Sequence, residues 1–316
     1  MPEMRDFGVL YLISGTKHLA VLVVSIFSLR KSGYDGPIHI AVGDDAAEEV
    51  VTLIAKDSYL QRLKGDERST FSWNLTWGRW QPPTGQRGDG YRQKCFMDSL
   101  SPFEKTVFLD ADTIVRGSLD PLFTPEPYGV TLTQFSDWKS NGRKIPGRIK
   151  SWTDVAPGDV AEMLAKSYPA INTGILSWRK SPEADAFFQE WRELSAKKPV
   201  FIVDELAAQL IFWRHAVRVL GSRWNCSPIH DHSDSRGNAI IFHFHGKKHI
   251  NREQGRAIWL PVYDECCRLG IASINKWTPA GDKRLREYLE GKHRDGAGEP
   301  DDEETLTVPD EEDAAV

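Results

Sequence analysis

Two aspartates that stand one residue apart, Asp110 and Asp112, are the clearest sign of chemistry in this sequence. They lie in an apolar run, residues 107–115, that has the character of a buried strand. Because side chains on a strand alternate faces with a period of two, both carboxylates should project to one side where the strand leaves the sheet. Two like charges beside an apolar strand are costly unless a hard divalent cation neutralises them. The pair therefore predicts a carboxylate metal site at the end of a central strand.

The elements that must position this pair follow from hydrophobic periodicity. The chain opens with a β-rich run, a helix that Thr16 could cap, a second strand and a second helix with acids near its N-terminus, which is a βαβα pattern. Residues 64–90, rich in Gly, Pro and Trp, look like one long loop. Strands are expected at residues 8–13, 37–42, 128–133, 170–178 and 239–244, and helices at 19–29, 44–56, 91–100, 182–196, 203–215 and 256–269.

Composition allows a full enzyme and argues against several other classes. With 316 residues, 40% of them hydrophobic, the chain can bury one large core or two small ones. A net charge of -5 argues against nucleic acid as the main partner. The apolar run at residues 19–29 is too short to span a bilayer, and the N-terminus shows no secretion signal. The four cysteines lack metal spacing and look like reduced thiols, so we expect a cytoplasmic protein in which the sequons at Asn74 and Asn225 are unused.

Four motifs in a fixed order carry a family resemblance. They are Asp110-Ala111-Asp112 after its apolar strand, Asn172-Thr173-Gly174, Asp204-Glu205-Leu206, and Phe242-His243-Phe244-His245-Gly246 with two lysines following. Together they resemble the glycogenin-like retaining glycosyltransferases, a family that includes bacterial lipopolysaccharide galactosyl- and glucosyltransferases. The resemblance covers about residues 8–260.

The resemblance implies a fold and a reaction. The fold is GT-A, an α/β architecture in which helices flank a Rossmann-like, mixed but mostly parallel central sheet. It would form a single domain over residues 1–277, followed at 278–316 by a helical extension and an acidic, disordered tail. The implied reaction moves a hexose from a nucleotide diphosphate sugar, by default linked to UDP, with retention of configuration. Mn²⁺, or Mg²⁺, would be the cofactor.

For the metal, the resemblance makes Asp110 and Asp112 ligands and places Ala111 near the donor ribose. The third protein ligand would be His243, and an imidazole suits Mn²⁺ better than it suits Mg²⁺ or Ca²⁺. His245 competes for this role, because strand periodicity puts both histidines on one face. Without the aspartates, either histidine would read as an ordinary core residue.

The donor contacts implied by the family fall on several loops and strand ends. The family usually has a lysine where this chain has His249, so we expect Lys247 or Lys248 to contact the phosphates. A cation there offsets the charge that develops on the departing diphosphate. Asn172 to Gly174 could equally be the start of an ordinary strand. The full set is Ser14, Gly15, Asp44, Arg92, Lys94, Ala111, Asn172, Thr173, Gly174, Gly246, Lys247 and Lys248.

Two adjacent acids, Asp204 and Glu205, are the candidates for catalysis at the sugar. The family commonly has an aspartate followed by an amide here, whereas this chain has a second carboxylate. Glu205 could act as a nucleophile or stabilise an oxocarbenium-like centre, while Asp204 could hydrogen-bond the sugar. The plainer reading is that both are dipole-favourable acids in the first turn of a helix.

Two alternatives from other classes stay open on sequence. One is a phosphatase that forms an aspartyl-phosphate on Asp110, with Asp112 as the acid, although that pattern usually opens the fold and wants Thr or Val where this chain has Ile114. The other is a protein that binds a nucleotide sugar without turning it over. The acceptor is undefined: a glycan, a lipid-linked saccharide, a small metabolite or a protein side chain.

Overall fold

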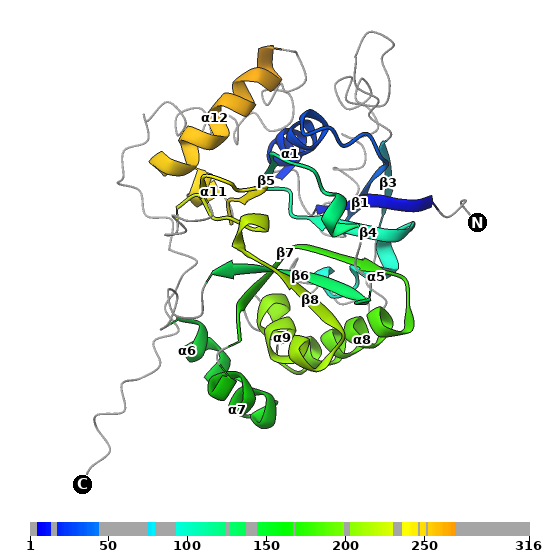
Figure 1. The fold of residues 1–316 in the computed structure, drawn as a ribbon, viewed down its shortest axis with the longest axis vertical. Coiled ribbons are helices and arrows are strands. Elements are labelled where there is room, and N and C mark those ends of the chain that lie inside the picture. The colour runs from blue at the N-terminus through cyan, green and yellow to red at the C-terminus, as the bar shows by residue number, and fades with distance from the viewer. Residues whose placement is uncertain are drawn as a thin grey trace.

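The structure, a computed structural model, is centred on a seven-stranded mixed sheet with helices on both faces (Figure 1). It describes residues 5–13, 18–43, 75–79, 93–123, 127–136, 144–166, 168–198, 203–229, 236–245, 247–250 and 252–268. The strands of the large sheet are β1 (Arg5–Ile13), β2 (Ile38–Val42), β3 (Leu75–Arg79), β4 (Phe103–Leu109), β6 (Val130–Ser136), β7 (Ala170–Arg179) and β8 (Val217–Leu220). A small sheet pairs β5 (Thr113–Val115) with β9 (Ile241–His243).

The order of the large sheet is β3-β2-β1-β4-β7-β6-β8. Neighbours run parallel except at β7, which is antiparallel to both β4 and β6. The carboxyl ends of β1, β2 and β4 therefore meet at one edge, where the amino end of β7 joins them. Ligands of doubly wound sheets bind at this edge. The predicted α/β class with a mixed, mostly parallel sheet is confirmed.

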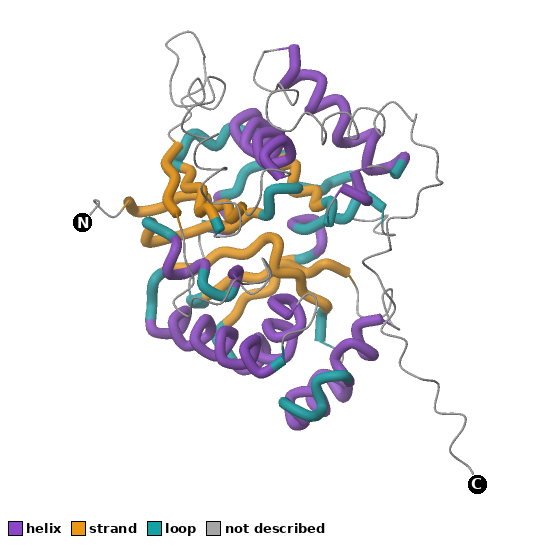
Figure 2. Tube along the Cα trace, turned by 180° about the vertical axis from the view of Figure 1, so that it is seen from behind, coloured by secondary structure: helices purple, strands orange, loops and turns teal. Residues whose placement is uncertain are grey.

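Helices cover the sheet on both faces, as the view from behind also shows (Figure 2). Strand alternation produces two cores: Val9 and Tyr11 of β1 face one, and Leu10 between them faces the other. Helices α1 and α12 close the first core with the small sheet, and α8 and α9 close the second. The helices are α1 (Leu19–Lys31), α5 (Met97–Leu100), α6 (Lys144–Lys150), α7 (Pro157–Lys166), α8 (Pro182–Lys197), α9 (Val203–Ile211), α11 (Lys247–Ile250) and α12 (Glu253–Arg268).

Helix α1 connects the sheet to the strand that follows the aspartate pair. It is apolar on nearly all sides, as a helix buried all round must be. Its two buried serines make hydrogen bonds to residues outside the helix. Ser25 Oγ lies 3.1 Å from Tyr11 Oη and 2.7 Å from Thr113 Oγ1. Ser28 Oγ accepts from the backbone N–H of Val115 at 2.9 Å. The position of β5 is thus set by hydroxyl contacts inside a hydrophobic core.

Several predicted boundaries are wrong. The run at residues 107–115 is not one strand, because β4 ends at Leu109 and a turn precedes β5. The long loop predicted over residues 64–90 contains an edge strand, β3, parallel to β2. The helix predicted over residues 91–100 is interrupted at Cys95 and Phe96, within its described part.

Besides β3, four α-helices and strands of the described residues were not predicted: β8, α6, α7 and α11. The helices expected near residues 182–196 and 256–269 match α8 and α12, and the one at 203–215 continues past α9 as a 3₁₀ turn, Phe212–Arg214. The helix at 44–56, the cap at Thr16 and the tail at 278–316 lie outside the described residues. No helix in the described part of the chain is both long and apolar enough to cross a bilayer.

Replacing Ser28 by alanine should lower the free energy of unfolding by about 1–3 kcal/mol, because it leaves the buried N–H of Val115 without its acceptor. Urea denaturation measures the change. Ser99→Ala is the control: its exposed hydroxyl bonds only locally, to the Phe96 carbonyl, so its effect should stay within about 0.5 kcal/mol. Equal stability of the two variants would contradict the role assigned to Ser28.

Candidate functional site

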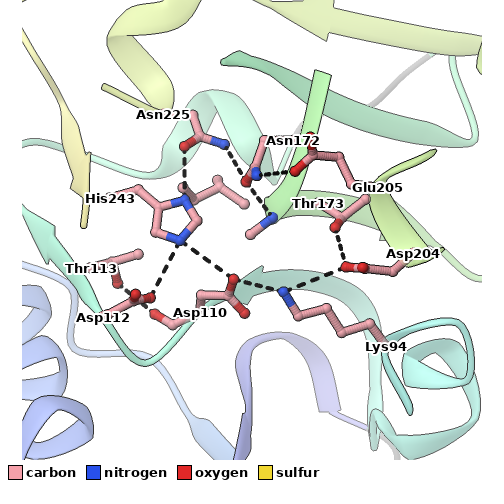
Figure 3. A network of polar contacts seen from close by, with 12 residues as sticks. Lys94, Asp110, Asp112, Thr113, Asn172, Thr173, Asp204, Glu205, Asn225 and His243 are labelled. Carbon is pink, nitrogen blue, oxygen red and sulfur yellow. Dashed lines mark hydrogen bonds and ion pairs between the residues drawn. The ribbon is translucent and has the colours of Figure 1, made fainter. Parts of the chain in front are cut away.

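Two carboxylates and one imidazole converge where β4 leaves the large sheet (Figure 3). Asp110 follows β4, Asp112 precedes β5, and His243 ends β9, where it pairs with Thr113. His243 Nε2 lies 3.3 Å from Asp112 Oδ1 and 3.4 Å from Asp110 Oδ2. One ligand atom from each residue falls within 4.8 Å of the others, close enough for a single divalent ion.

Hydrogen bonds to the backbone hold the turn that carries the two aspartates. The N–H of Asp110 donates to the carbonyl of Gly174 at 2.7 Å, and the carbonyl of Asp112 accepts from the N–H of Phe244 at 3.0 Å. Thr113 Oγ1 donates to the carbonyl of Asp110 at 2.9 Å. The turn is therefore bound to β7 on one side and to the segment after β9 on the other.

Two basic side chains, Lys94 and His243, contact the aspartates. Lys94 Nζ lies 2.7 Å from Asp110 Oδ2 and 3.7 Å from Asp204 Oδ2. Burial alone would lower the pKa of Lys94, but Asp110 and Asp204 raise it above its usual value. Burial likewise opposes the charge on His243, yet Asp112 and Asp110 raise its pKa to about 9. The negative charge of the two aspartates thus favours a cation beside His243. This donor set fits a divalent ion.

Gly174 is required by the close approach of β7 to this cluster. A Cβ on Gly174 would lie 2.2 Å from His243 Cε1 and 2.7 Å from Asp110 Oδ2. Real Cβ atoms do not make such contacts with buried groups. The glycine of the Asn-Thr-Gly motif thus has a steric explanation.

Asp204 and Glu205, in the first turn of α9, bond to the other two residues of that motif. Thr173 Oγ1 donates to Asp204 Oδ2 at 2.6 Å, and Asn172 Nδ2 donates to Glu205 Oε2 at 2.8 Å. Burial raises the pKa of Asp204, with Lys94 opposing it, and its Oδ1 has no hydrogen-bond partner among the described residues. Burial, and next the charge of Asp204, raise the pKa of Glu205 to about 7. A carboxylate with that pKa can gain or lose a proton near neutral pH.

His245 does not join the cluster of ligand atoms. Strand periodicity does not apply to it, because β9 ends at His243 and His245 has a φ of +48°. Its ring centroid lies 3.9 Å from that of His243 and meets Phe135 edge-on. The two histidines are thus neighbours, and the one that faces both aspartates is His243.

The structure describes part of the predicted donor set. It brings Lys94 and the Asn172–Gly174 motif against the aspartate cluster, and it places Ala111 in the turn between the aspartates. Lys247 and Lys248 begin α11. The remaining predicted positions, Ser14, Gly15, Asp44, Arg92 and Gly246, lie outside the described residues.

Sequence reasoning missed Asn225, which is fully buried beside His243. Its Oδ1 lies 3.0 Å from His243 Nδ1. In the sequence this residue shows only as a glycosylation sequon. No local sequence pattern predicts the contact between Asn225 and His243. Asn225 lies in the segment after β8, and only the folded chain brings it next to β7 and β9.

Comparisons with known proteins agree with this architecture. A family model described as "Mannosyltransferase putative" matches residues 6–146, a range that includes Lys94 and both aspartates. The WbbM bifunctional glycosyltransferase has 13% identity and a TM-score of 0.54 over 83% of this chain and 50% of its own. The glycosyltransferase GlyE of Streptococcus pneumoniae TIGR4 has 14% identity and a TM-score of 0.53, over 90% of this chain and 65% of its own. No curated protein matches the chain in sequence.

These matches confirm the predicted GT-A fold and the resemblance to glycosyltransferases that have it. At such identities, similarity of structure extends to the fold alone. The chain spans half of the length of WbbM and about two thirds of the length of GlyE.

Gly174→Ala should destabilise the protein by about 1–3 kcal/mol, because the new methyl group overlaps His243 and Asp110. Chemical denaturation measures the loss. The matched control is Gly158→Ala in α7, where a Cβ meets nothing within 4 Å and stability should stay level or rise by about 0.5–1 kcal/mol. Unchanged stability of Gly174→Ala would show that the close packing around His243 is incorrect.

Glu205→Gln should gain stability over the wild type as the pH rises. A pKa raised from 4.5 to about 7 means that Glu205 favours the folded state only below its ordinary pKa, and that this contribution is lost as the pH rises through 7. At about 1.4 kcal/mol per pKa unit, the variant's relative gain between pH 5 and pH 8 is about 2–3 kcal/mol. Urea unfolding at both pH values measures it. Exposed Glu193→Gln on α8 should show no such difference, and a flat result for Glu205→Gln would contradict its burial.

Proposed function

We propose that this chain, which the family match and the fold indicate to be a glycosyltransferase, transfers a hexose from a nucleotide diphosphate sugar in a metal-dependent reaction. The observation that carries the proposal is the convergence of Asp110, Asp112 and His243 at the ligand-binding edge of a GT-A sheet. The catalytic domain would comprise residues 1–277, and we propose a cytoplasmic location for the enzyme.

The three residues of the cluster would hold Mn²⁺, with Mg²⁺ as the other candidate. When bound, the ion would neutralise negative charge on the diphosphate of the donor. The mixed oxygen and nitrogen donor set supports Mn²⁺, because it accepts an imidazole more readily than Mg²⁺ does. Lys94 would help to hold the carboxylate of Asp110 in place through its 2.7 Å contact.

The donor would lie along the edge formed by the ends of β1, β2 and β4. Ser14, Gly15 and Asp44 follow the first two of these strands and are proposed to contact the base and ribose, with Ala111 near the ribose. Arg92 and Lys94 would face the diphosphate or the sugar. Gly246 would contact the donor, and either Lys247 or Lys248 would contact the departing diphosphate, where a lysine stabilises the charge that develops.

Retention of configuration would depend on the acids of α9. Glu205 is held by the amide of Asn172 and would act as a nucleophile or stabilise the oxocarbenium-like centre. Asp204, whose Oδ1 is not occupied by any described partner, would accept a hydrogen bond from a sugar hydroxyl. The acceptor would be a glycan, a lipid-linked saccharide, a small metabolite or a protein side chain.

A thermal-shift screen of nucleotide sugars with and without Mn²⁺, followed by donor-hydrolysis and transfer assays, tests the proposal. The screen should contain UDP-hexoses, and GDP-mannose because the family model is one of mannosyltransferases. A donor at 100 times its dissociation constant should stabilise the wild type by about 2.7 kcal/mol. Asp112→Asn should lose the Mn²⁺-dependent part of that shift and about 100-fold or more in turnover.

Exposed Asp35→Asn serves as the matched control and should behave as the wild type does. Full turnover by Asp112→Asn in metal-free buffer would refute the metal site. Donor binding by the wild type with neither hydrolysis nor transfer would instead support a nucleotide-sugar-binding protein.

A further inference from the structure

A chain of three hydrogen bonds connects His243 to Glu205 through two buried amides (Figure 3). His243 Nδ1 and Asn225 Oδ1 are 3.0 Å apart, Asn225 Nδ2 and Asn172 Oδ1 are 3.1 Å apart, and Asn172 Nδ2 and Glu205 Oε2 are 2.8 Å apart. Asn225 also contacts Thr133 Oγ1 through its Nδ2 at 2.9 Å. Every polar atom of the Asn225 side chain is thus engaged.

The chemistry of its neighbours fixes which way each amide points. The backbone N–H of Gly174 can only donate, and it donates to Asn172 Oδ1 at 2.8 Å. The NH₂ group of Asn172 must then face Glu205, as an acceptor carboxylate requires. Asn225 meets the oxygen of Asn172, so it must present its own NH₂ group there. This leaves the carbonyl oxygen of Asn225 for His243.

The last step assigns the proton on the histidine ring. An amide oxygen can only accept, so Nδ1 of His243 must carry a proton. In the neutral ring the lone pair then sits on Nε2, the nitrogen that lies 3.3 Å from Asp112 Oδ1 and 3.4 Å from Asp110 Oδ2. The hydrogen bond from His243 Nδ1 to the amide of Asn225 therefore leaves the lone pair of Nε2 available to a cation between the two aspartates.

We propose that Asn225 is a positioning residue that fixes the tautomer and the ring orientation of His243 for metal binding. It acts through the histidine, and Gly174 and Asn172 fix its own orientation in turn. This inference rests on the proposed function in one respect, that His243 is a metal ligand. Partners of this kind orient ligating histidines and typically change metal affinity by about 10- to 100-fold.

Binding of Mn²⁺ alone to the full chain, measured by electron paramagnetic resonance of the free ion, tests the proposal without relying on turnover. Asn225→Leu is close in size and removes the acceptor, so Mn²⁺ affinity should fall by about 10- to 100-fold. Asn225→Asp keeps an acceptor for Nδ1 and should bind Mn²⁺ more tightly than Asn225→Leu does. Thr133→Val removes another contact of the same buried amide without touching His243 and should bind Mn²⁺ as the wild type does.

The outcomes separate this inference from the proposed function. Absence of Mn²⁺ binding in the wild type would defeat both. Wild-type affinity in Asn225→Leu, or an equal loss in Thr133→Val, would overturn the role of Asn225 alone. Should Asn225→Leu fail to fold, ¹⁵N magnetic resonance of the wild type with Mg²⁺ decides: a proton on Nδ1 of His243 and coordination by Nε2 are expected, and coordination by Nδ1 would refute the assignment.

Discussion

The need to balance the negative charge of three neighbouring aspartates governs this site. Asp110, Asp112 and Asp204 lie within reach of one lysine and one histidine, and the carboxylates raise the pKa of both bases. Lys94 is central to this balance, because its ammonium group contacts both Asp110, which follows β4, and Asp204, which lies in α9. One face of the cluster thus already has its counter-charge, while the face between the aspartates and His243 depends on a proton or a metal ion.

The chemistry was more predictable from sequence than the geometry that presents it. Asp110 and Asp112 were recognisable because a carboxylate pair after an apolar strand is a local pattern. The strand predicted over residues 107–115 is nevertheless too long. The turn after Leu109 is fixed by backbone hydrogen bonds to Gly174 and Phe244, which lie far along the chain. Asn225 was missed for the same reason. Its role exists only once the segments after β8 and β9 have met.

Contacts from both α1 and β7 fix the position of the turn that carries Asp110 and Asp112. The hydroxyls of Ser25 and Ser28 on α1 hold β5, and the backbone of β7 holds the turn from the other side. The hydrogen bonds from Ser25 and Ser28 are buried, and a buried hydrogen bond is costly to lose. The edge strand β3 and the short β8 went unpredicted, because strands of four or five residues take their identity from their neighbours in the sheet.

Because β7 is antiparallel to β4 and β6, its two ends lie at opposite edges of the sheet, and only one of these edges carries the aspartate cluster. Because β7 starts where its neighbour β4 finishes, its first residues supply Asn172 and Gly174, and its last residues lie at the far rim beside the start of α8. The connection between Lys180 and α8 is therefore remote from the chemistry. We expect an insertion after Lys180 to leave the aspartate cluster in place, whereas an insertion just before Ala170 would displace Asn172 and Gly174.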